Sequence, residues 1–102
     1  MPMKHFLVEI TYTVPLAQID AALPRHREFL QRGYDSGLLL MSGPQAPRVG
    51  GVVLARAASQ AVLERFFDQD PFRAEGLAHY RYVEFSPVKH QGMLAPWCGA
   101  AS

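Results

Sequence analysis

Three side chains of the sequence could together move a proton: His26, Asp35 and Asp70. A histidine with a carboxylate partner is the smallest unit that transfers protons near neutral pH, because the carboxylate fixes the imidazole tautomer and supports its charged form. Each residue also has a simpler explanation. His26 could be a core histidine bonded to a backbone carbonyl, Asp35 a turn residue before Gly37, and Asp70 a helix N-cap before Pro71. The elements that carry these residues decide between the two interpretations.

His26 occupies an apolar position of a helical pattern. The other members of this stripe, at helical spacing, are Ile19, Leu23, Phe29, Leu30 and Gly33. His26 lies three residues after one apolar member and three before the next, so its side chain is expected to face the interior. A buried imidazole without a hydrogen-bond partner costs about 1–3 kcal/mol. The helix therefore predicts a partner for His26.

The position of Pro24 predicts where this helix begins. Proline disrupts a helix interior but suits the first helical position, so we expect a lead-in turn over residues 16–23 and the main helix from Pro24 to Gly33 or Gly37. On an ideal helix, nine residues at ~100° each place Asp35 opposite His26. Asp35 is thereby weakened as the partner, although Gly33 could redirect the chain.

Strand and helix patterns predict an α+β fold. Strand patterns cover residues 4–13, 38–41, 52–55 and 78–85, and a second amphipathic helix follows the N-cap residue Ser59. Pro71 ends this helix and opens a short turn that closes near Gly76. The resulting order βαββαβ is that of a ferredoxin-like fold with both helices on one face of the sheet. Asp70 then approaches His26 from the second helix and ranks ahead of Asp35.

The second face of the predicted sheet has no helix to cover it. Leu7 and some of the leucines and valines of the middle strands point to this face. An exposed apolar sheet marks an interface, and a two-fold homodimer is its commonest partner arrangement. Trp97, in a tail without periodicity, either lies against the partner subunit or belongs to a frayed terminus.

Composition and spacing disfavour several other classes of function. The net charge is +1, with ten basic and nine acidic residues interspersed, so no nucleic-acid partner is expected. The sequence has no long apolar run at its start or elsewhere, so neither a signal peptide nor a membrane span is expected. The lone Cys98 cannot form an internal disulfide and favours the cytoplasm. No histidine or cysteine pair has metal-ligand spacing, and serine nucleophile and phosphate-loop patterns are missing.

A set of short motifs resembles the YciI-like family, defined by the YCII-related domain. Their order and spacing span residues 4 to about 88, and we divide the chain into a YciI-like domain, 1–88, and a tail, 89–102. The motifs are Pro24-Arg25-His26, Asp35-Ser36-Gly37-Leu38-Leu39, Ser42-Gly43-Pro44, Gly50-Gly51-Val52, Asp70-Pro71-Phe72 and Val83-Glu84-Phe85.

This resemblance implies a dimeric α+β barrel without a cofactor, and a site built on His26 with Asp70 or Asp35. Some relatives eliminate halide from chlorinated aromatic diols and quinols. Ser42, Arg48 and Phe72 are further candidates for substrate binding, with Arg48 expected to be exposed for an anionic group or simply solvated. Two functions fit: a lyase, isomerase or hydrolase acting on a small organic or aromatic molecule, and a module that binds such a ligand without turnover.

Overall fold

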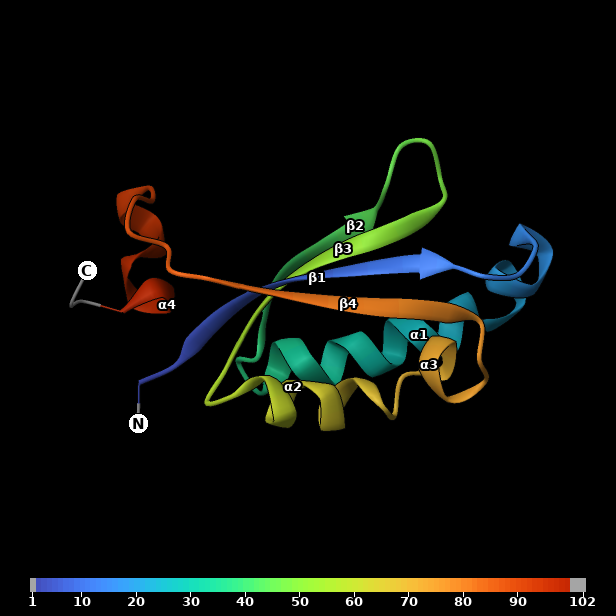
Figure 1. The fold of residues 1–102 in the computed structure, drawn as a ribbon, viewed down its shortest axis with the longest axis horizontal. Helices are drawn as coiled ribbons and strands as arrows, with labels where there is room; N and C mark the ends of the chain where they lie inside the picture. Colours follow the sequence, from blue (N-terminus) through green and yellow to red (C-terminus); the bar gives the residue numbers. More distant parts are fainter. Residues whose placement is uncertain (1, 100–102) are drawn as a thin grey trace.

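A computed structural model describes residues 2–99, so that Met1 and residues 100–102 of the predicted tail lie outside the described residues. The elements follow the order βαββαβ, with a short third helix and a tail appended (Figure 1). They are β1 (Lys4–Tyr12), α1 (Leu16–Asp35), β2 (Leu39–Pro44), β3 (Gly50–Ala57), α2 (Gln60–Phe67), α3 (Pro71–Ala74), β4 (Ala78–Phe85), the 3-10 helix η1 (Gly92–Leu94) and α4 (Ala95–Cys98).

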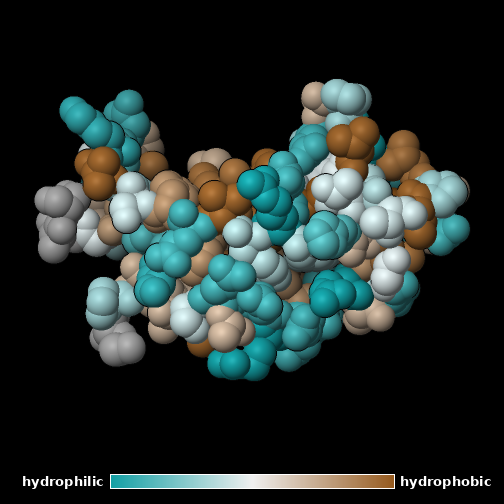
Figure 2. Space-filling view, viewed as in Figure 1, coloured by the Kyte–Doolittle hydropathy of each residue, from teal (hydrophilic) through white to brown (hydrophobic). Residues whose placement is uncertain are grey.

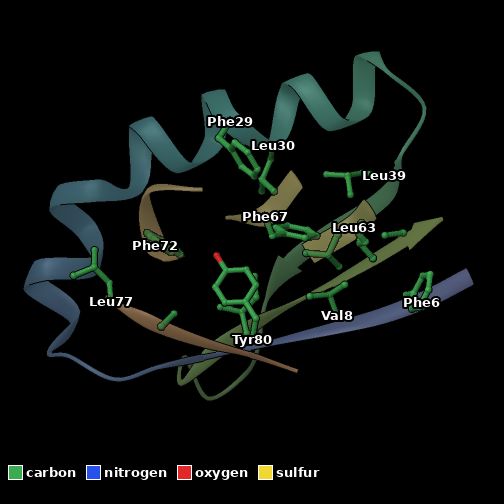
Figure 3. Packing of buried hydrophobic residues seen from close by; sticks show 14 of the residues in the cluster. Phe6, Val8, Phe29, Leu30, Leu39, Leu63, Phe67, Phe72, Leu77 and Tyr80 are labelled. Atoms are coloured by element: carbon green, nitrogen blue, oxygen red, sulfur yellow. The ribbon is translucent and has the colours of Figure 1, made fainter. Parts of the chain in front are cut away.

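The four strands form one antiparallel sheet in the order β2–β3–β1–β4. Helices α1, α2 and α3 all lie on one side of it (Figure 1). Alternate residues of the central strand β1, namely Phe6, Val8 and Ile10, are buried against these helices, as a half-covered strand requires. Phe67 of α2 lies between α1 and the sheet in this core (Figure 3). The ferredoxin-like α+β prediction is confirmed.

Helix α1 runs unbroken through Pro24, so the prediction of a helix beginning at Pro24 is wrong. Pro24 removes one backbone hydrogen bond, but its side chain is exposed, and the carbonyl of Asp20 four residues earlier lies at a solvated position. The buried stripe continues on both sides of the proline, from Ile19 to Gly33. Packing of this stripe along a 20-residue helix outweighs the local preference.

Helices α2 and α3 begin at the predicted N-cap residues. Ser59 accepts a hydrogen bond from the backbone N–H of Val62, and Asp70 accepts one from that of Phe72. Gly76 follows α3 with a φ of +68°, a left-handed conformation that glycine adopts without strain. This turn returns the chain to β4 and keeps Asp70 at the corner between α2 and α3.

The other face of the sheet carries no helix. Leu7 is opposite Leu54 of β3 and Val83 of β4, and all three are half-buried. Figure 2 shows apolar residues along this side, between the tail and the β2–β3 hairpin. The tail covers one end, where the carbonyl of Trp97 contacts His5 and Arg56 of the same chain. No helix within residues 2–99 is long and apolar enough to cross a membrane.

Replacing Gly50 with alanine should destabilise the fold strongly. An added Cβ would lie 1.8 Å from the backbone oxygen of Ile10, and two paired strands cannot separate locally to relieve this contact. We expect Gly50→Ala to lower the free energy of unfolding by about 3 kcal/mol or more, measured by urea denaturation. The control Gly43→Ala, where no atom lies within 4 Å of the added Cβ, should stay within about 0.5 kcal/mol. Equal effects of the two substitutions would contradict the register of β1 with β3.

Two tyrosines of β4 should make the fold sensitive to alkali. Burial is the main cause that raises the pKa of both Tyr80 and Tyr82, with nearby carboxylates adding to it. A neutral buried phenol stabilises the fold fully below its unfolded pKa near 10, and this contribution is lost as the pH rises above that value. Absorbance titration at 295 nm should show these two phenols ionising together with unfolding. Their reversible ionisation in a folded chain near pH 10 would contradict the burial.

Candidate active site

His26 lies on the buried stripe of α1 and faces the corner between α2 and α3. Its Nδ1 is 2.8 Å from Oδ1 of Asp70. The histidine is only 7% exposed and the aspartate is fully buried. The structure therefore brings together the helix histidine and the higher-ranked of the two candidate aspartates.

The buried carboxylate of Asp70 accepts three hydrogen bonds. Oδ1 accepts from His26 and, at 3.1 Å, from the backbone N–H of Phe72, while Oδ2 accepts from the hydroxyl of Tyr80. A buried charge needs such partners, since desolvation without them is costly. An ionised carboxylate only accepts, so Nδ1 of His26 carries the proton. The other ring nitrogen, Nε2, has no hydrogen-bond partner among residues 2–99.

The ring of Phe72 supports one face of the His26 imidazole. Its ring is stacked on that of His26, with centroids 3.9 Å apart and planes inclined by only 6°. The same residue donates its backbone N–H to Asp70. Phe72 is 1% exposed, so it fixes the plane of the histidine and forms the floor of the site.

A cavity of about 370 Å³ opens beside His26, between α1 and the side of the sheet formed by β2 and β3. Its apolar walls include Ile10, Leu23, Leu30 and Val53, and its polar lining includes His26, Ser42 and the charged residues Asp20, Arg27 and Arg48. Because Nδ1 is held by Asp70, Nε2 is the nitrogen that His26 can offer to a molecule in this cavity. Within residues 2–99, no three histidine, cysteine or acidic side chains form a group that could hold a metal ion.

Two polar pairs lie at the mouth of this cavity. Arg48, in the loop between β2 and β3, is 2.5 Å from Asp20 of α1, and the hydrogen bond between them raises the pKa of the arginine. The hydroxyl of Ser42 is 2.5 Å from that of Tyr34. Arg48 is partly exposed but paired, so an anionic ligand would have to share it with Asp20.

Asp35 is not brought to the site. It lies exposed in the last turn of α1, where Oδ1 accepts a hydrogen bond of 2.8 Å from the side chain of Gln31. Because α1 continues through Gly33 without a bend, nine residues carry Asp35 to the face opposite His26. The candidacy of Asp35 as the histidine's partner is therefore wrong.

Tyr80 is the site residue that the sequence reasoning missed. Burial, and next the charge and hydrogen bond of Asp70, raise its pKa, so the phenol keeps its proton and acts as a donor. The sequence analysis predicts a strand over residues 78–85 without assigning Tyr80 to either face, and a buried tyrosine hydroxyl usually has a partner. A tyrosine on the buried face of this strand would therefore predict a hydrogen bond, but not its acceptor.

Comparison with known proteins identifies one solved structure of similar fold and one matching protein family. The 5-chloro-2-hydroxyhydroquinone dehydrochlorinase TftG from Burkholderia phenoliruptrix AC1100, solved in complex with 2,5-dihydroxybenzoquinone, superimposes with a TM-score of 0.69 at 18% identity, covering 87% of this chain and 97% of that one. No curated protein sequence matches significantly. The model of the YCII-related domain matches residues 3–86, and the chain therefore belongs to the family of YCII-related domain proteins.

Proposed function

We propose that this protein is a small, cofactor-independent enzyme in which His26 is the acid–base catalyst and Asp70 orients it. The observation that carries the proposal is the 2.8 Å contact between Nδ1 and Oδ1 at the edge of a cavity. A carboxylate on one ring nitrogen makes the other a better proton acceptor. The cytoplasmic location expected from the lone cysteine remains a prediction.

The substrate class is a small hydroxylated aromatic ring. A cavity of 370 Å³ is near the lower end of the range for small-molecule sites, and its apolar walls suit a flat ring. TftG acts on a chlorinated hydroquinone and was solved with a hydroxylated quinone. The fold relation alone does not transfer this activity, but it identifies the first compounds to try.

The reaction class that fits is an elimination started by proton removal. A hydroxyl proton of the substrate first moves to the ring carbon that carries the leaving group, which gives the keto tautomer with a tetrahedral carbon at that position. Nε2 of His26 then takes a proton from a second hydroxyl, the electron pair of the O–H bond forms a carbonyl, the ring double bond shifts, and the leaving group, such as chloride, departs with its bonding pair. His26 then returns its proton to water. Asp70 stabilises the imidazolium between these steps and does not itself receive the proton.

The remaining candidates have supporting roles. Phe72 holds the imidazole in plane, and Ser42 and Arg48 bind polar or anionic groups of the substrate at the cavity mouth. Arg48 reaches such a group by sharing or leaving its contact with Asp20.

Substitution of the dyad tests the function. We expect His26→Gln and Asp70→Asn to lower the turnover of 5-chloro-2-hydroxyhydroquinone, followed by absorbance of the quinone product, by about 10²-fold or more. The control His79→Gln removes an exposed histidine of β4 and should leave turnover unchanged. Thermal shift with 2,5-dihydroxybenzoquinone reports binding separately.

Full turnover by folded His26→Gln would overturn the catalytic role. Ligand stabilisation of the native protein without turnover of any hydroxylated or halogenated ring would favour the binding module. Loss of the folded state in Asp70→Asn would show that the aspartate acts mainly as a helix cap.

The assembly proposed for this enzyme is a homodimer with the two sheets packed face to face. Leu7, Leu54 and Val83 lie in register on the uncovered face, and Phe85 and Val52 on the same face are exposed. A second copy presents the same apolar surface, so a two-fold axis makes the contact self-complementary.

A charge on this face should therefore separate the subunits. We expect light scattering to give a dimer at micromolar concentration for the native chain and a monomer or unfolded chain for Leu54→Glu. The control Leu16→Glu places the same charge at an exposed position in the first turn of α1, where it suits the helix dipole. A monomeric native protein would contradict the proposed assembly.

A further inference from the structure

Tyr80 is the inner-face residue of β4 that contacts the dyad. Its hydroxyl donates to Oδ2 of Asp70, the carboxylate oxygen that faces away from His26. Figure 3 shows the side chain rising from β4 with its hydroxyl directed toward the helical layer. Tyr80 is only 8% exposed, so water does not compete freely for this contact. The chain thus continues from His26 through Asp70 to a third residue.

We propose that Tyr80 is a positioning residue that fixes the Asp70 carboxylate and, through it, the imidazole of His26. This inference rests on the proposed function, because it assigns a second layer of support to the same dyad. It extends the site from α1 and the α2–α3 corner to the sheet.

Tyr80 constrains the geometry of the Asp70 carboxylate. Oδ1 is held by two donors, His26 and the backbone N–H of Phe72, whereas Tyr80 is the one donor to Oδ2 among residues 2–99. Donors on both oxygens define the plane of the carboxylate. Without the phenol, Oδ2 is a buried acceptor with no partner, and the carboxylate must turn or find water to satisfy it. Either response changes the orientation of the carboxylate plane relative to the imidazole, although Oδ1 keeps its two donors.

Tyr80 also changes the distribution of charge on the carboxylate. A hydrogen bond from Tyr80 draws negative charge toward Oδ2, so less remains on Oδ1 to attract the proton on Nδ1. Removing the hydroxyl should therefore shorten and strengthen the hydrogen bond from Nδ1 of His26 to Oδ1. It should also leave the plane of the carboxylate less firmly fixed. The phenol keeps its proton, because burial and Asp70 both raise its pKa.

Packing alone does not require the hydroxyl. The ring of Tyr80 lies 5.5 Å from that of Phe67 in a tilted contact that phenylalanine would make equally well. Tyr82 offers a matched control on the same strand and face. Its ring lies 6.2 Å from Phe67, and its hydroxyl has no hydrogen bond to the described residues.

The test compares Tyr80→Phe with Tyr82→Phe in the full chain without ligand. Proton NMR of protein that carries isotope-labelled histidine reports the Nδ1–H resonance of His26. This resonance is assigned by its loss in His26→Gln. We expect this resonance to move downfield in Tyr80→Phe and to stay in place in Tyr82→Phe. Where turnover is measurable, Tyr80→Phe should lower kcat about 10- to 100-fold with little change in KM, as expected for a supporting partner.

An unmoved Nδ1–H resonance in folded Tyr80→Phe would overturn the inference even if His26→Gln abolishes turnover. A moved resonance with full turnover by His26→Gln would leave Tyr80 supporting the pair while the proposed function fails. If Tyr80→Phe does not fold, 3-fluorotyrosine at position 80 gives a stronger donor, and the resonance should then move upfield. No movement there would also overturn the inference.

Discussion

The buried carboxylate of Asp70 is the constraint on which the site depends. A fully buried charge is stable only with donors around it, and here they come from three separate elements: His26 of α1, the N-terminus of α3 through Phe72, and Tyr80 of β4. Satisfying one side chain therefore fixes the helical layer against the sheet. The two explanations that the sequence offers for Asp70, helix cap and histidine partner, are both correct as geometry.

This double use ties the stability of the fold to the geometry of the candidate site. Breaking a buried pair by removing one partner typically costs about 3–5 kcal/mol, because the other group is left uncompensated. His26 is bound to the carboxylate by its ring nitrogen and to Phe72 by stacking, so it too contributes to packing. A loss of activity in any variant of this cluster is informative only beside a measurement of folding.

Alternation and capping residues predict most of the fold, because each depends on neighbours in sequence. The burial of Phe6 and Val8 on one face of β1 and the caps at Ser59 and Asp70 follow from such local patterns. Pro24 does not, since the packing of a long stripe overrides its local preference. Helical geometry ranks Asp70 above Asp35, but the acceptor for Tyr80 depends on how closely β4 approaches the α2–α3 corner, which no local pattern records.

The lining of the cavity combines apolar walls with charged side chains. The arginine at its mouth that the sequence singles out, Arg48, is already neutralised by Asp20, so an anion would compete with a carboxylate held nearby. Arg27 also lines the cavity, whose apolar walls include Leu23, Leu30 and Val53. Such walls exclude water and strengthen the attraction between an imidazolium and Asp70. For the proposed substrate, a neutral hydroxylated ring, burial of its faces would supply the affinity, and the proposed dyad would supply the chemistry through Nε2.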